Sequence, residues 1–171
     1  SHLKLHRFQT DSPDRQKCKE YVEEALNKMN DLFSMYVEHL KYFTELIETA
    51  VACSEMQSND VETIEKKLGG GWVAEETAAI AIYCTLKYFD NFEEAMIASV
   101  NHAGDSDSTG AVTGNILGAA LGYEAIPQHF KDDLEMHELI LHMADDLYRG
   151  KSAKFQRECE PTDDNKKIFN I

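Results

Sequence analysis

Proline, positive charge and paired cysteines are scarce in this sequence of 171 residues. Only three prolines occur, Pro13, Pro127 and Pro161, which leaves long stretches free to form helices. Lys and Arg number 17 against 31 Asp and Glu, so the formal net charge is −14. Nucleic-acid phosphates are bound by clustered basic residues, and this excess of acid therefore argues against a nucleic-acid partner.

The four cysteines, Cys18, Cys53, Cys84 and Cys159, are widely spaced and form no C-x-x-C pair. This spacing argues against a zinc site or a disulfide scaffold and favours reduced thiols in a cytoplasmic protein. The sequence shows no signal-peptide pattern and no apolar run long enough to span a bilayer. We therefore expect no membrane partner.

Strand-like alternation of apolar and polar residues is also absent, and the sequence predicts an all-α fold. We expect a single domain over residues 1–171, with residues 1–13 and 151–171 irregular. Glycine is missing before Gly69, and most glycines lie at 69–71 and 104–122.

Apolar residues recur at alternating steps of four and three from Val22 to Ala50, an a/d pattern over roughly four heptads. It predicts one long helix, or two helices broken near Asn30-Asp31. The pattern suits either a helical core or a seam to a second chain. The aromatic residues Phe33, Tyr36 and Phe43 favour the core, and a partner at the helix of about 20–52 stays the alternative.

Further helices follow from turn and cap signals. Ser58 or Asn59 is expected to cap a helix that ends at Gly69-Gly70-Gly71. The next helix is expected to start at Trp72 and to end at Asp90-Asn91, with Val73, Thr77, Ile80, Ala81, Cys84 and Tyr88 on its buried face.

A short helix over 92–101 should then turn Phe92, Ala95, Met96 and Val100 inward. Pro127 ends the following segment, and Asp132 or Asp133 is expected to cap a last amphipathic helix. The acidic pairs Glu23-Glu24, Glu75-Glu76, Asp132-Asp133 and Asp145-Asp146 are expected on solvated helix faces.

Four glycines recur every four residues, at 110, 114, 118 and 122, and the first of them is the last residue of the segment GDSDSTG. A glycine inside a helix costs about 0.5–1 kcal/mol relative to alanine, so a stripe of them needs a reason. The stripe predicts a tightly packed central helix that another backbone, or a ligand, approaches closely.

The segment GDSDSTG offers Asp105, Asp107 and Ser108 within one turn. These residues suit a helix cap, and they also suit a hard cation such as Mg²⁺ or Mn²⁺. A calcium EF-hand loop is excluded, because its twelfth position is Ile116 instead of Glu. A haloacid-dehalogenase-type nucleophile, D-x-D-x-T, is disfavoured because no hydrophobic strand precedes it.

The stretch NHAGDSDSTGAVTGNILGAALGYEAIP resembles the C-terminal signature of the ADP-ribosylglycohydrolases. The upstream stretches LGGGWVAEETAAIAIYCTLKY and FEEAMIASV are similar to that family as well, in the right order, so that the match covers about residues 68–127. Ala103 departs slightly from the commoner Gly-Gly-Asp pattern.

The resemblance implies an orthogonal all-α bundle around two divalent cations, Mg²⁺ or Mn²⁺. It implies hydrolysis of the glycosidic bond between ADP-ribose and a modified side chain, with an ADP-ribosylated protein or ADP-ribose as partner. Asp105, Asp107 and Ser108 would be metal ligands, and the GGGWV turn would lie near the substrate.

The resemblance covers only the second half of the family pattern. The early G-D-x-x-G and the acidic D-D cluster of the first half of the family pattern are not found. The catalytic residues are expected in that missing first half, and the substrate-binding residues stay unassigned. We therefore expect the C-terminal part of such an enzyme, partnered by an N-terminal half or a second copy. A non-catalytic helical interaction module that retains the family scaffold is the alternative.

Overall fold

The computed structural model of the chain describes residues 14–150, which form helices and contain no strand. The all-α prediction is therefore confirmed. The described chain divides after Pro127 into two compact units, residues 14–127 and residues 128–150. The single domain predicted over 1–171 stays a prediction, and the irregular ends predicted at 1–13 and 151–171 lie outside the described residues.

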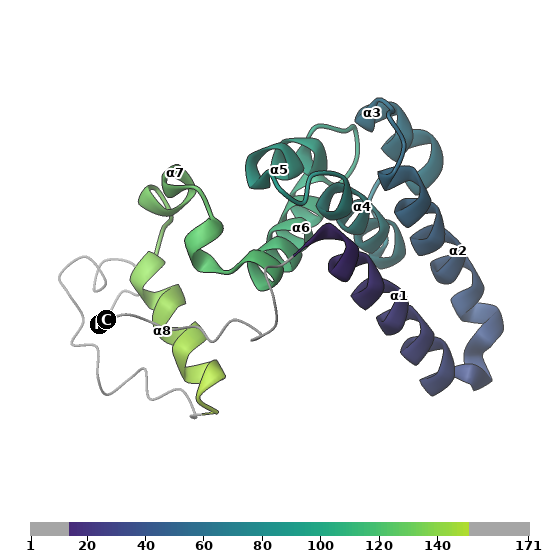
Figure 1. The fold of residues 1–171 in the computed structure, drawn as a ribbon, viewed down its shortest axis with the longest axis horizontal. Helices are drawn as coiled ribbons and strands as arrows, with labels where there is room; N and C mark the ends of the chain where they lie inside the picture. The colour runs from purple at the N-terminus through teal and green to yellow at the C-terminus, as the bar shows by residue number, and fades with distance from the viewer. Residues whose placement is uncertain (1–13, 151–171) are drawn as a thin grey trace. The chain divides into compact units, whose positions relative to one another are not determined.

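The larger unit begins with an antiparallel hairpin of two helices (Figure 1). Helix α1 runs over Arg15–Leu32, the 3₁₀ turn η1 over Ser34–Tyr36 and α2 over Val37–Ser54. The predicted break near Asn30-Asp31 falls slightly later, at Phe33, which is the C-cap of α1.

The apolar residues of the heptad pattern face the core along only part of the hairpin. Ile47 and Ala50 are buried, and Val22, Leu26 and Phe43 pack against the core as partly buried residues. The expectation that Phe33 and Tyr36 belong to the core is wrong, because both are about half exposed at the turn. The buried part of α2 begins only at Leu46.

A short helix and a π-helical turn lead to the central helix of this unit. Helix α3 covers Asp60–Thr63, and Asn59 caps it by accepting a hydrogen bond from the Glu62 amide at 2.9 Å, as predicted. The π-helical turn η2, Ile64–Leu68, ends at Gly69, whose φ of 97° favours glycine.

Helix α4 spans Ala74–Lys87 and packs against both α2 and α6 (Figure 1). Thr77, Ile80, Ala81 and Cys84 are buried as predicted, while Val73 is exposed. The helix begins later than expected, because Trp72 belongs to the glycine turn.

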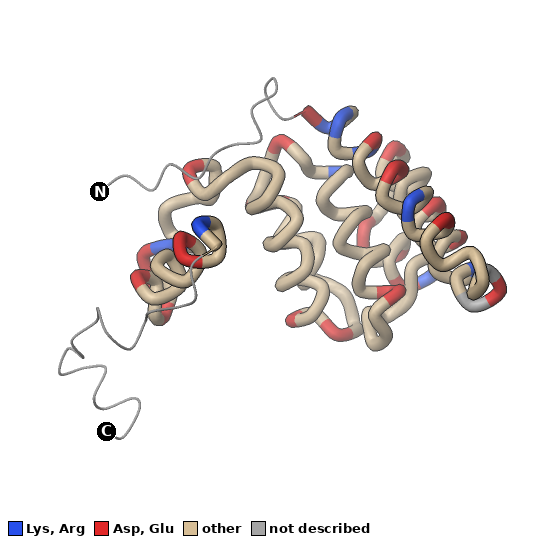
Figure 2. Tube along the Cα trace, turned by 90° about the horizontal axis from the view of Figure 1, so that it is seen from below, with Lys and Arg blue, Asp and Glu red and all other residues tan. Residues whose placement is uncertain are grey.

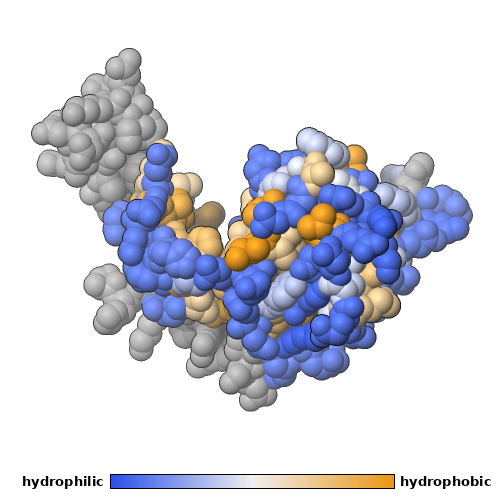
Figure 3. Space-filling view, turned by 90° about the horizontal axis from the view of Figure 1, so that it is seen from above, coloured by the Kyte–Doolittle hydropathy of each residue, from blue (hydrophilic) through white to orange (hydrophobic). Residues whose placement is uncertain are grey.

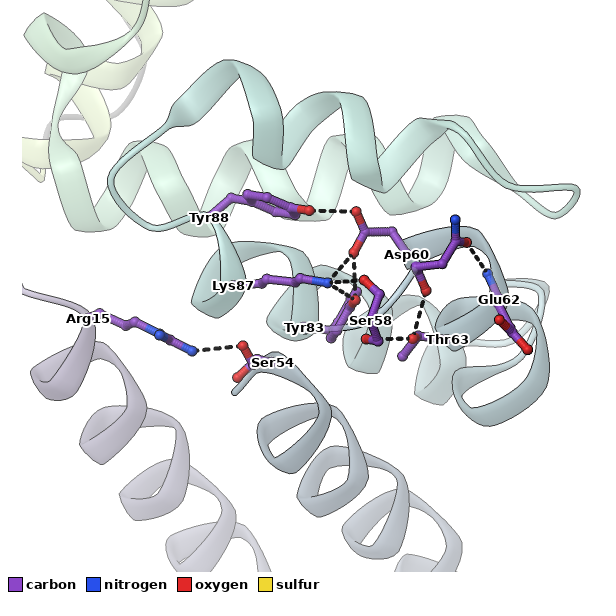
Figure 4. A network of polar contacts seen from close by, with 10 residues as sticks. Arg15, Ser54, Ser58, Asp60, Glu62, Thr63, Tyr83, Lys87 and Tyr88 are labelled. Atoms are coloured by element: carbon purple, nitrogen blue, oxygen red, sulfur yellow. Dashed lines mark hydrogen bonds and ion pairs between the residues drawn. The ribbon is translucent and has the colours of Figure 1, made fainter. Parts of the chain in front are cut away.

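A network of polar contacts joins α3 to α4 (Figure 4). The Asp60 carboxylate accepts hydrogen bonds from Tyr83 Oη at 2.6 Å, Lys87 Nζ at 2.7 Å and Tyr88 Oη at 2.6 Å. Lys87 also donates to the Ser58 carbonyl at 2.8 Å. The network therefore links the start of α3 to the last turn of α4.

Helices α5, Phe92–Val100, and α6, Ser106–Leu121, complete this unit with the 3₁₀ turn η3, Tyr123–Ala125. Gly110 of the glycine stripe allows α6 to pack closely against α5, because a Cβ at this position would lie only 2.8 Å from Val100 Cγ1. At Gly118 a Cβ would meet nothing within 4 Å. Val100, predicted to face inward, is 40% exposed.

The described part of the second unit holds α7, Gln128–Asp132, and α8, His137–Tyr148. The prediction that Asp132 or Asp133 caps the last helix is wrong. Asp132 ends α7, and the N-cap of α8 is Met136 in the left-handed conformation, with φ of 56°. Asp145 of α8 accepts from Arg149 Nε at 2.9 Å.

Cys18, Cys53 and Cys84 are free thiols, and Cys159 lies outside the described residues. Burial raises the pKa of the Cys84 thiol well above its ordinary value, which keeps it protonated and unreactive. Within residues 14–150, no helix combines the length and the hydrophobicity that crossing a membrane requires.

Candidate metal centre

The candidate ligands lie at the N-terminal end of α6. Asp105 is the N-cap, Asp107 and Ser108 lie in the first turn, and the Thr109 amide donates to the Asp105 carbonyl at 3.2 Å. Asp107 is the one charged residue of α6, and in Figure 2 this helix is tan except at its start. The positive end of the helix dipole stabilises carboxylates placed there.

The three side chains lie close together. Hydrogen bonding with Asp107, and then with Ser108, lowers the pKa of Asp105. Asp105 and Ser108 are half-buried, whereas Asp107 is exposed. Two carboxylates and a hydroxyl are hard oxygen donors, and this donor set fits Mg²⁺ or Mn²⁺.

The donor set is too small to hold a binuclear centre alone. No group of three or more His, Cys, Asp or Glu side chains suited to a metal forms within residues 14–150. Two near-octahedral cations require more ligands than two carboxylates and one hydroxyl. The assignment of Asp105, Asp107 and Ser108 as metal ligands stays a prediction.

The triglycine turn crosses directly over the start of α6. The Asp105 amide donates to the Gly70 carbonyl at 2.7 Å. A Cβ on Gly104 would lie 1.8 Å from the Gly70 carbonyl oxygen, and one on Gly71 would lie 2.8 Å from Thr109 Cγ2. The backbones of the two segments therefore touch where side chains would keep them apart.

Two glutamates hold this crossing from either side. Glu76, in the first turn of α4, accepts from the Gly70 amide at 3.1 Å and the Trp72 amide at 3.3 Å through Oε2. Glu65 of η2 accepts from the Ala103 amide at 3.2 Å. The expectation that Glu75-Glu76 belongs to a solvated face is therefore wrong for Glu76, which is half-buried.

A buried threonine fixes the other side of the first turn of α6. Thr109 Oγ1 donates to the Ser99 carbonyl at 2.6 Å and lies 3.0 Å from His102 Nε2. His102 Nδ1 accepts from the Gly104 amide at 3.1 Å, which places the proton of the neutral ring on Nε2. These contacts hold residues 99–109 in one arrangement.

An open hollow of about 470 Å³ lies beside the candidate ligands. The glycine turn and the start of α4 form one wall, with Trp72, Val73 and Thr77. Asp105, Ser108, Ala111 and Val112 form the wall on the side of α6. Trp72 is 72% exposed, so its indole presents a large apolar surface to a molecule in this hollow.

Sequence reasoning named the candidate ligands but missed the residues that hold their loops. Asp105, Asp107 and Ser108 were visible because one short segment carries them. Glu65 contacts a segment 38 residues away in the sequence. The contacts of Glu76 and His102 are with nearby residues, but they depend on how the neighbouring turns fold back, which no residue pattern reports. The sequence predicted a close backbone approach at the glycine stripe of α6, whereas this crossing is made by the triglycine turn and Gly104.

Comparison with known proteins agrees with the resemblance in the sequence. Residues 7–157 match the family model described as ADP-ribosylglycohydrolase. An uncharacterized protein of Archaeoglobus fulgidus is 31% identical over 131 residues, which make up 75% of this chain and 38% of that protein. No solved structure matches the chain significantly.

Two named relatives are similar over shorter parts. The ADP-ribosylhydrolase ARH3 of Bos taurus is 28% identical over 67% of this chain and 32% of its own length. The ADP-ribosylarginine hydrolase Tri1 of Serratia proteamaculans is 38% identical over 43% of this chain and 19% of its own length. The matched region thus spans between 19% and 38% of these three relatives. Since the family model covers most of this chain, the chain belongs to the ADP-ribosylglycohydrolase family.

Proposed function

We propose that this chain supplies one side of the metal centre of an ADP-ribosylglycohydrolase. The enzyme would hydrolyse the glycosidic bond between ADP-ribose and a modified side chain, with two divalent cations, Mg²⁺ or Mn²⁺. The observation that carries the proposal is the placement of Asp105 and Ser108 on the wall of an open hollow at the start of α6, with Asp107 in the same turn.

The chain's own residues would bind and orient. Asp105, Asp107 and Ser108 would hold the cations, which stabilise negative charge on sugar oxygens and activate water when bound. The glycine turn fixes the Asp105 backbone through the 2.7 Å hydrogen bond to Gly70. Trp72 and Val73 offer apolar surface that limits the access of water to the hollow.

The match to this chain covers only part of each relative. The remaining metal ligands and a catalytic carboxylate would come from a region that corresponds to the unmatched part of those relatives. The activities for which two relatives are named, ADP-ribosylhydrolase and ADP-ribosylarginine hydrolase, support a substrate that carries ADP-ribose. They do not select one acceptor side chain for this chain.

The proposal is tested by calorimetry with ADP-ribose, with and without Mn²⁺, on the chain alone and mixed with an N-terminal half supplied by a family relative. We expect ADP-ribose to bind only with Mn²⁺ present, and more tightly in the mixture. Folded protein that binds neither Mn²⁺ nor ADP-ribose in both settings would refute the proposal.

One observation favours the alternative of a non-catalytic interaction module. The turn of the α1–α2 hairpin exposes Leu32 at 78% and Met35 at 81%, and these are apolar residues that a partner could cover. The face drawn in Figure 3 is mainly hydrophilic, with smaller hydrophobic areas. Association of the chain with a partner in the absence of any Mn²⁺ or ADP-ribose binding would support this alternative.

A further inference from the structure

The glycine turn beside the hollow cannot hold its own conformation. Gly69 and Gly71 have φ of 97° and 74°, values that favour glycine. Glycine loses more conformational freedom on folding than any other residue, so a run of three requires contacts from outside the turn. Since the turn carries Trp72 and touches Asp105, whatever holds the turn also shapes the candidate site.

The Glu76 side chain is placed to hold the glycine turn. One carboxylate oxygen, Oε2, accepts from both the Gly70 amide and the Trp72 amide. A Cβ on Gly69 would lie 2.4 Å from Glu76 Cδ, so the turn folds directly onto this side chain. Hydrogen bonds to an ionised carboxylate are stronger than those between neutral groups, and two of them meet at one atom here.

The contact extends from Glu76 to the candidate ligand. Glu76 fixes the amide of Gly70, and the carbonyl of the same residue accepts from the Asp105 amide at 2.7 Å. Gly70 also supports the indole, because a Cβ there would lie 2.8 Å from Trp72 Cδ1. One carboxylate therefore controls both the indole wall and the backbone of a ligand.

We propose that Glu76 is a positioning residue of the candidate metal centre, which holds the glycine turn so that Asp105 and Trp72 keep their places around the hollow. This inference deepens the proposed function and rests on it for the role of Asp105. Glu76 would touch neither cation nor substrate.

Glu75 provides a matched control. It also lies in the first turn of α4, so both glutamates interact favourably with the dipole of that helix. Among residues 14–150, no hydrogen bond joins Glu75 to the glycine turn, whereas Glu76 holds two of its amides. A role limited to helix stability would give similar effects at both positions.

Amide hydrogen exchange tests the proposal on the full chain without any metal. In Glu76→Ala we expect the Asp105 amide to exchange about tenfold faster, since its acceptor Gly70 is no longer held. Glu75→Ala should leave that amide unchanged. Glu76→Gln keeps an acceptor oxygen and should restore most of the protection, while core amides such as that of Cys84 report any loss of the whole fold.

Trp72 gives a second readout, because it is the one tryptophan of the chain. We expect its fluorescence anisotropy to fall in Glu76→Ala and to stay at the wild-type value in Glu75→Ala. Unchanged Asp105 exchange and unchanged anisotropy in Glu76→Ala would overturn the proposal. Equal changes in both alanine variants would also overturn it.

Titration with Mn²⁺ separates this inference from the proposed function. If the wild-type chain binds Mn²⁺, Glu76→Ala should weaken the affinity about tenfold and Glu75→Ala should not. If the wild-type chain binds none even with an N-terminal half, the proposed function fails. The role of Glu76 in holding the turn is still decided by the exchange and anisotropy measurements.

Discussion

Gly70 and Gly104 lie where two backbone segments touch. The 2.7 Å hydrogen bond from the Asp105 amide to the Gly70 carbonyl requires the two backbone segments to approach more closely than side chains permit. A Cβ at Gly104 would meet the carbon and oxygen of the Gly70 carbonyl, which are backbone atoms that cannot rotate away. The contact therefore ties the conformation of the glycine turn to the start of α6.

Gly104→Ala and Gly118→Ala form a pair that tests this contact. We expect Gly104→Ala to lower the free energy of unfolding by about 1–3 kcal/mol, because one segment must move. Gly118→Ala should raise it by about 0.5–1 kcal/mol, since open space surrounds this helical position. Urea denaturation measures both, and equal effects of the two substitutions would contradict the account.

The residues of this region differ in how far the sequence predicts them. Asp105, Asp107 and Ser108 could be proposed as ligands because their oxygens lie within one short segment. Glu76 was expected on a solvated face, because its neighbour Glu75 and the helix start suggested a dipole role for both. Its contact with the glycine turn depends on how that turn folds back, which no periodicity reports.

At the scale of elements, the Asp60 network decides how α3 meets α4 (Figure 4). Burial alone would raise the pKa of Asp60, but hydrogen bonds from Lys87, Tyr83 and Tyr88 outweigh it and lower the pKa. Burial and the hydrogen bond to Asp60 raise the pKa of Tyr88 to about 12. The network is therefore most stable with Asp60 ionised and Tyr88 protonated.

Asp60→Asn should destabilise the chain by about 2 kcal/mol at neutral pH, since Lys87 and two tyrosines lose their ionised acceptor. The difference from wild type should begin to shrink below about pH 4, the ordinary pKa of an Asp side chain, and should be lost as the pH falls through the lower pKa of Asp60 in the folded chain. The difference in stability between wild type and Asp60→Asn should also shrink above about pH 10. There the pH approaches the raised pKa of Tyr88, and the hydrogen bond from its hydroxyl to Asp60 is lost when the tyrosine ionises.

Thermal unfolding across this pH range provides the measurement. Asp90→Asn, which removes an exposed carboxylate that follows α4, is the matched control and should show little effect at any pH. A constant difference between wild type and Asp60→Asn from pH 3 to 11 would show that the charge of Asp60 is not what stabilises the contact.

Most elements followed from the sequence, and the errors have local causes. Asn59 and the Asp90-Asn91 break were correct because capping chemistry is local. The start of α8 was wrong because Asp132 and Asp133 satisfy the capping pattern, yet a separate short helix, α7, ends there. The π-helical turn η2 follows an ordinary helical start and could not be distinguished from it by spacing.

For the molecule as a whole, the charge of −14 complicates any test of metal binding. Divalent cations associate weakly with many carboxylates of such a chain, and the total heat or stoichiometry does not identify a site. The matched region also covers only between 19% and 38% of the three relatives. If some ligands of the site lie outside this chain, the ligands that it does hold would bind a cation weakly. A useful measurement must report on individual residues.

Substitution of Asp107 tests the ligand assignment at that resolution. Asp107→Asn removes one charge at the candidate centre, and Asp133→Asn removes one exposed charge from the other unit as the matched control. Both variants change the net charge equally. Only the first is expected to affect a specific site.

The most direct test of the central claim is the broadening of amide signals in NMR spectra of the full chain as Mn²⁺ is added. The account predicts selective broadening at residues 104–109 and 70–73 at low Mn²⁺ concentration, lost in Asp107→Asn and kept in Asp133→Asn. Broadening spread evenly over the acidic helices, or unchanged in Asp107→Asn, would contradict a metal centre at the start of α6.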